Sequence, residues 1–134
     1  MKLDPRASLI TVEAEVFKAA KSRIVRMALD TGATYLMVPW HVVEILGYAP
    51  AKVRSKISIT TASGTEITPL LTLDKVKVLG WPVEKVLAIC HDLPPQSPVD
   101  GLLGLSFLKW FDIDLHFQRG KLEFKGRSRR IAVK

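Results

Sequence analysis

The sequence predicts one domain built mostly of β-strands, either a barrel or a sandwich. Apolar and polar residues alternate in several short runs, and glycine, proline and small polar residues separate these runs, as is typical of strands joined by turns. No segment with helical periodicity is longer than about ten residues. The 134 residues suit one compact core, and 48% hydrophobic with 25% charged residues is typical of a folded globular chain.

Two strands and a short helix are predicted in the first part of the chain. Residues 9–17 alternate between apolar and polar side chains, which predicts a half-buried strand. Residues 24–29 are nearly all apolar and end abruptly at Asp30, so a buried strand delivers a carboxylate to a loop. A proline directly before residues 40–46 and a glycine directly after them predict a helix over that segment.

The middle of the chain predicts a hairpin, two further strands and a loop. Alternation on both sides of a small-residue turn at 61–65 predicts a hairpin over Ser58 to Thr68. Residues 71–79 and 83–90 are rich in β-branched residues and are separated by Gly-Trp-Pro, which predicts two strands. Three prolines in residues 91–99 predict a loop.

A glycine-bounded apolar segment, a helical turn and a last hairpin are predicted at the end of the domain. The segment Gly101-Leu102-Leu103-Gly104 is followed by Ser106, which we expect to cap one helical turn over 107–110. Alternation in residues 111–117, a turn ending in glycine, and alternation in 121–124 predict the hairpin.

The net charge of +7 comes from 20 basic and 13 acidic residues and raises the question of nucleic-acid binding. Much of the excess lies near the end of the chain, so we expect a domain over residues 1–125 and a basic tail over 126–134. We favour a solvated or disordered tail over a tail that contacts the phosphates of a nucleic acid, so nucleic acid is not expected as a partner. An alternative for Ile131-Ala132-Val133 is a strand added at a subunit interface.

We expect a cytoplasmic protein without a membrane partner, because the sequence shows neither a membrane-spanning run nor a signal peptide. No apolar run reaches the roughly 18 residues needed to span a bilayer, and the first six residues lack the apolar core of a signal peptide. Cys90 is the single cysteine and cannot form an internal disulfide, so nothing requires an oxidising compartment.

The candidate catalytic segment is Asp30-Thr31-Gly32-Ala33-Thr34. A carboxylate after an apolar strand has a raised pKa unless charges or hydrogen-bond donors compensate. Gly32 allows a backbone N–H to approach the acid, the Thr31 hydroxyl can fix the loop, and the small Ala33 leaves space beside the carboxylate.

This segment resembles the catalytic turn of the retropepsin-like aspartic proteases, and Val99-Asp100-Gly101-Leu102-Leu103-Gly104 resembles their second element, two hydrophobic residues followed by glycine. The predicted hairpin at 58–68 lies where that family carries its flap, and residues 107–124 resemble the bacterial single-domain members. The resemblance spans about residues 8–125. It implies a closed β-barrel of the acid-protease type, with one or two short helices.

The resemblance also implies roles for individual residues. Asp30 would be the catalytic aspartate, with Thr31, Gly32 and Ala33 supporting the turn, and Thr31 would exchange hydrogen bonds with the same turn of a second subunit. Ser63 and Gly64 would lie at the flap tip and bind an extended peptide through backbone groups.

Peptide hydrolysis by carboxylates requires two carboxyl groups that share a proton. The chain has one Asp-Thr-Gly turn, so the second copy must come from a second chain in a homodimer. We therefore expect an aspartic endopeptidase acting on peptide or protein substrates without a cofactor. The alternative is a dimer of the same fold that binds peptides or mediates oligomerisation with little proteolysis.

Other residues that could carry chemistry favour structural roles. The spacing of the three histidines and the cysteine matches no metal site, so no metal is expected. The tryptophans lie beside apolar or turn residues and are expected in the core or lining a pocket rather than stacked on bases. These are Trp40, Trp81 and Trp110.

Overall fold

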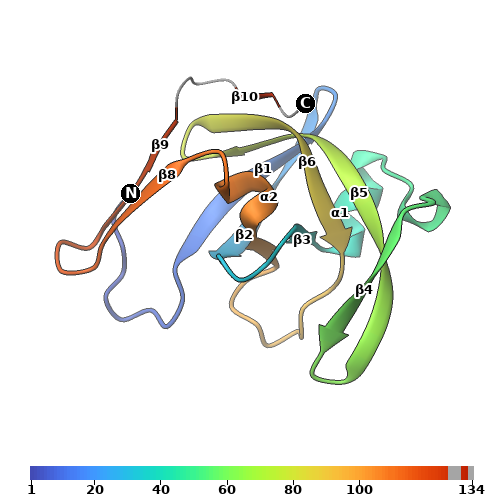
Figure 1. Cartoon of the computed structure of the whole chain (residues 1–134), viewed down its shortest axis with the longest axis horizontal. Coiled ribbons are helices and arrows are strands. Elements are labelled where there is room, and N and C mark those ends of the chain that lie inside the picture. Colours follow the sequence, from blue (N-terminus) through green and yellow to red (C-terminus); the bar gives the residue numbers. More distant parts are fainter. Residues whose placement is uncertain (127–130, 133–134) are drawn as a thin grey trace.

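The computed structural model describes residues 1–126 and 131–132 (Figure 1). The strands are β1 (Thr11–Lys18), β2 (Lys21–Leu29), β3 (Leu36–Val38), β4 (Lys56–Thr61), β5 (Gly64–Val78), β6 (Trp81–Cys90), β7 (Gly101–Leu103), β8 (Asp112–His116), β9 (Lys121–Lys125) and β10 (Ile131–Ala132). The helices are α1 (Trp40–Leu46), the 3-10 turn η1 (Pro50–Lys52) and α2 (Leu105–Leu108). Among the residues described, no helix is both long and apolar enough to cross a membrane.

Six strands form a closed barrel, which confirms the predicted fold class. The ring runs β6-β3-β7-β2-β1-β5 and closes because β5 also pairs with β6. β4 pairs only with the outer part of β5, so the β4–β5 hairpin projects beyond the barrel (Figure 1). β8 and β9 form a separate antiparallel pair.

The central feature of the barrel is β7, which lies between β2 and β3. It runs parallel to β2, with Leu29 opposite Leu103, and antiparallel to β3, with Met37 opposite Leu102. The loop of residues 30–35 connects β2 to β3 in the chain. The second motif is therefore inserted between the two strands that carry the first one.

The barrel interior is filled by the residues that the alternation predicted. Val12, Ala14 and Val16 on β1 are 3%, 0% and 0% exposed, respectively.

Helix α1 follows the prediction, and Gly47 directly after it adopts φ 99, a left-handed conformation that glycine adopts without steric cost. The three tryptophans are partly buried against the core, as expected.

The hairpin and the strand after it differ from the prediction. The turn is shorter than 61–65, because Thr61 already pairs with Gly64 and leaves only Ala62 and Ser63 between the strands. β5 then continues without a break through Pro69, where the sequence suggested two separate strands. One strand therefore belongs to the hairpin at its start and to the barrel at its end.

The basic tail lies partly within the described residues. Ile131 and Ala132 form β10, which runs parallel to Val83 and Glu84 of β6 in the same chain. These two residues are therefore not the solvated or disordered segment that was expected. Residues 127–130 and 133–134 lie outside the described part of the chain, so the expectation for them stays untested.

Candidate active site

Strand β2 places Asp30 at the start of a loop that backbone hydrogen bonds hold in position. The Asp30 N–H donates to the carbonyl of Leu103 at 3.0 Å, and the Ala33 N–H donates to the carbonyl of Asp30 at 3.2 Å. The Gly32 N–H donates to Asp30 Oδ1 at 2.9 Å, as the sequence suggested. Asp30 is half-buried, whereas Thr31 and Gly32 are exposed on this protomer.

The far side of the loop is bound to the start of α2. The N–H groups of Leu105 and Ser106 donate to the carbonyls of Ala33 and Thr34 at 2.8 and 2.9 Å. Gly104 lies directly against this loop: a Cβ there would lie 2.6 Å from the carbonyl oxygen of Ala33. The close approach of the two motifs therefore requires glycine at this position, although its backbone is extended.

Ser106 does not cap α2, contrary to the sequence-based expectation. The helix begins at Leu105, after Gly104, and has no side-chain cap. The Ser106 hydroxyl instead accepts from the N–H of Leu36 at 3.1 Å and donates to the carbonyl of Leu87 at 2.7 Å. A buried hydroxyl with two backbone partners holds β3 and β6 together behind the loop.

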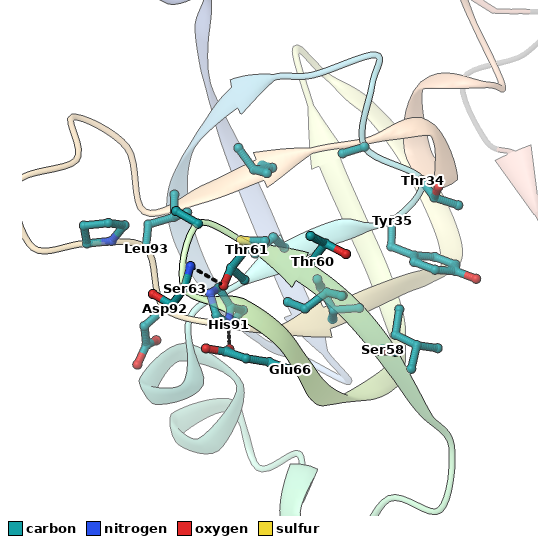
Figure 2. Close-up of a pocket in the computed structure, with 18 of the residues that line it drawn as sticks. Thr34, Tyr35, Ser58, Thr60, Thr61, Ser63, Glu66, His91, Asp92 and Leu93 are labelled. Atoms are coloured by element: carbon teal, nitrogen blue, oxygen red, sulfur yellow. Dashed lines mark hydrogen bonds and ion pairs between the residues drawn. The ribbon is translucent and has the colours of Figure 1, made fainter.

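A cleft of about 920 Å³ begins at the loop and runs beneath the β4–β5 hairpin. Gly32 and Ala33 line it, and Figure 2 shows Thr34 and Tyr35 on one side and Leu93 on the other.

At the tip of the hairpin, Ser63 lines the cleft, and its N–H donates to Thr61 Oγ1 at 3.2 Å. Gly64 does not line the cleft but forms the first pair of the hairpin with φ 122, a backbone conformation that favours glycine. The two predicted hairpin residues thus lie at the tip, and one of them faces the cleft.

The wall opposite the Asp30 loop was missed by the sequence analysis. It consists of residues 91–95, which follow the buried end of β6 and which the prolines marked only as a loop. His91 Nδ1 lies 3.4 Å from Oε2 of Glu66 on the hairpin. Asp92 Oδ1 accepts the N–H of Trp40, the first residue of α1, at 3.0 Å. The available signal was the position of polar residues directly after a buried strand, as at Asp30.

Cys90, which ends β6 directly before the wall at 91–95, is a poor candidate for a nucleophile. Cys90 is 1% exposed, and burial, followed by the charges of Glu44 and Asp92, raises the pKa of its thiol to about 12. A thiol that keeps its proton at neutral pH is a poor nucleophile. Within residues 1–126 and 131–132, no group of three or more His, Cys, Asp or Glu side chains could hold a metal ion.

Comparison with known proteins identifies the family. The family model described as aspartyl protease matches residues 12–107, which include the Asp30 loop, the β4–β5 hairpin and β7. The fold is similar to the crystal structure of a retropepsin-like aspartic protease from Rickettsia conorii, with a TM-score of 0.66 at 20% identity over 87% of this chain and 82% of that chain. The solution structure of the simian foamy virus (mac) protease gives a TM-score of 0.50 at 25% identity over 75% of this chain and 92% of that one.

No curated protein matches the chain significantly in sequence. The family model nevertheless covers well over half of the 134 residues, and the fold is similar to that of the solved structures. The chain belongs to the aspartyl protease family and has the retropepsin-like fold.

Proposed function

We propose that the chain is an aspartic endopeptidase that acts as a homodimer, with Asp30 of each protomer forming the catalytic pair. The observation that carries this proposal is the position of Asp30, which is half-buried after β2 and held by backbone groups in a loop whose Gly32 and Ala33 line a cleft of about 920 Å³. The family assignment supports peptide hydrolysis as the chemistry.

The reaction requires two carboxyl groups with one shared proton. The ionised carboxylate takes a proton from water, whose oxygen forms a bond to the peptide carbonyl carbon, while the protonated carboxyl gives its proton to the carbonyl oxygen. As this intermediate collapses, the C–N bond breaks, the protonated carboxyl gives its proton to the leaving nitrogen, and a hydroxyl of the intermediate returns a proton to the ionised carboxylate, which restores the pair. None of the described residues that hydrogen-bond to the Asp30 loop is acidic, so the second carboxyl group is assigned to a partner subunit.

The exposed side of the loop suits this assembly. Thr31 is exposed on the single protomer, so its hydroxyl can bond the same turn of a second copy. The β4–β5 hairpin is the flap of the proposal: an extended substrate lies beneath it, next to Ser63 and Gly64, and bonds to backbone groups as an added strand does.

The first test is cleavage of an unfolded protein from acidic to neutral pH, with Asp30→Asn alongside the parent. The amide keeps the side-chain volume but cannot take or share the proton, so we expect cleavage to be abolished while the fold is retained. Turnover by the variant within a few-fold of the parent would refute the role of Asp30. Cleavage by neither protein, with peptide binding retained by both, would support the alternative of a peptide-binding module.

The second test mixes parent chains with Asp30→Ala chains at fixed total concentration under conditions of subunit exchange. If the pair forms only between two parent chains, activity falls as the square of the parent fraction, whereas a self-sufficient monomer gives a straight line. Sedimentation of each pure protein checks that both form the same dimer. An active monomer at assay concentration would contradict the shared pair.

A further inference from the structure

The charge of the cleft is opposite to the charge of the whole protein. The chain carries a net charge of +7, yet none of its lysines or arginines is among the described residues that line the cleft. The charged side chains that do line it are Glu66, Asp92 and, when protonated, His91. Because the lining that the structure describes contains no lysine or arginine, the cleft of this positively charged protein gives a ligand a different electrostatic environment from the rest of the surface.

Glu66 and Asp92 differ in what their carboxylates contact. Asp92 accepts the backbone N–H of Trp40, so one of its oxygens already has a structural partner. Glu66 lies on β5 opposite Ile59, and its side chain is 48% exposed. Its contact is with His91, as the dashed line in Figure 2 shows, and the two atoms lie 3.4 Å apart.

The position of Glu66 suits contact with a bound peptide. Thr61 and Gly64 form the pair next to the hairpin turn, and Glu66 lies two residues after Gly64. At about 3.3 Å per residue, Glu66 is therefore about 7 Å from the tip. Ile59 and Ser63 line the same cleft, so the carboxylate belongs to the surface that a peptide beneath the hairpin would face.

We propose that Glu66 is a specificity-determining residue that favours substrates with lysine or arginine at the position beneath it. This inference rests on the proposed peptidase function. A cationic side chain gains attraction to Glu66 that a neutral one lacks, and an acidic side chain is repelled. His91 is the competing partner: when it is protonated, its positive charge lies against the same carboxylate.

The test uses short extended peptides derived from a sequence that the parent protein cleaves, with one position at a time changed to Lys, Gln or Glu. Kinetics are measured at about pH 6, where carboxylates are ordinarily ionised. For one position of the peptide we expect kcat/KM to be about two- to fivefold higher with Lys than with Gln, the range typical of a partly exposed ion pair. The preference should decrease as salt is added.

Three variants assign the preference to its source. Glu66→Gln should bring the Lys-to-Gln ratio close to one, and His91→Asn should increase it because the competing cation is removed. Glu13→Gln is the matched control: it makes the same charge change on an exposed residue of β1 outside the cleft, and should leave the ratio as in the parent. A ratio unaffected by Glu66→Gln at every position, or lowered equally by Glu13→Gln, would overturn the proposal.

A binding measurement separates failure of this inference from failure of the proposed function. The Asp30→Asn protein and its double variant with Glu66→Gln are titrated with extended peptides that carry Lys, Gln or Glu at one position, chosen without reference to cleavage, and the dissociation constants are compared. If the parent cleaves nothing but Asp30→Asn still binds Lys peptides more tightly than Gln peptides, and Glu66→Gln abolishes the difference, then the specificity stands without the peptidase. Equal affinities for the Lys, Gln and Glu peptides would overturn it.

Discussion

Gly104 is predicted to be irreplaceable because of contact rather than conformation. Its φ of −98 and ψ of −171 are open to any residue. A Cβ at this position would lie 2.4 Å from the carbonyl oxygen of Tyr35 and 2.6 Å from that of Ala33, and both are backbone atoms with little freedom to move. Gly104→Ala therefore pushes α2 away from the loop that carries Asp30.

The cost follows from the contacts that must change. Overpacking against a well-packed site costs about 1–3 kcal/mol, and loss of the two hydrogen bonds from Leu105 and Ser106 to the loop adds about 1 kcal/mol each, for a total of roughly 3–5 kcal/mol. For a domain of this size, that lowers Tm by roughly 10–15 °C.

The assay is urea and thermal unfolding of the parent, Gly104→Ala and Gly80→Ala. Gly80 is the matched control, since its φ is +82 but a Cβ there would have no heavy atom within 4 Å. Gly80→Ala should cost only about 1 kcal/mol, from backbone strain alone. A smaller loss of stability for Gly104→Ala than for Gly80→Ala would refute the steric argument.

Three further predictions concern Ser106, Cys90 and Gly64. Ser106→Ala leaves the N–H of Leu36 and the carbonyl of Leu87 without their partner and should lower the free energy of unfolding by about 1–3 kcal/mol, measured in urea. The folded state raises the pKa of the Cys90 thiol from 9.0 to about 12, so the contribution of this thiol to stability is present below pH 9 and is lost as the pH rises towards 12. Cys90→Ala should therefore make the free energy of unfolding less dependent on pH in this range. Gly64→Val strains the hairpin tip by about 1–2 kcal/mol, which lowers Tm by only about 3–7 °C, and should lower turnover by about tenfold; unchanged kinetics would argue against a flap.

The elements predicted correctly are those specified by local pattern. Alternation identified β1 and the last hairpin, and a proline and a glycine set the ends of α1, because each signal acts within a few residues along the chain. The continuation of β5 from hairpin to barrel was not predicted, since its first four residues are exposed on both faces and only later residues alternate. Pro69, which has no backbone N–H, separates the predicted hairpin at 58–68 from the predicted strand at 71–79.

The candidate site was predicted only in part for the same reason. Asp30 and its loop follow from an apolar strand that ends in a carboxylate, whereas the wall at 91–95 reaches the cleft through pairing of β6 with β3. The role of Ser106 likewise depends on partners at Leu36 and Leu87, which are 70 and 19 residues away in the sequence. Contacts over such separations leave no periodic signal.

Close packing explains why the second motif has glycine at positions 101 and 104. Neither Gly101 nor Gly104 has a positive φ, so conformational freedom does not explain them. A Cβ on Gly101 would lie 2.2 Å from the carbonyl oxygen of Met37 on β3, and one on Gly104 would lie within 3 Å of the loop of residues 30–35. Gly101 at the start of β7 and Gly104 directly after the strand must therefore lack a side chain for β7 to fit between β2 and β3. The same close fit brings the carbonyl of Leu103 to the N–H of Asp30, so the spacing of two glycines around two leucines fixes the position of the carboxylate.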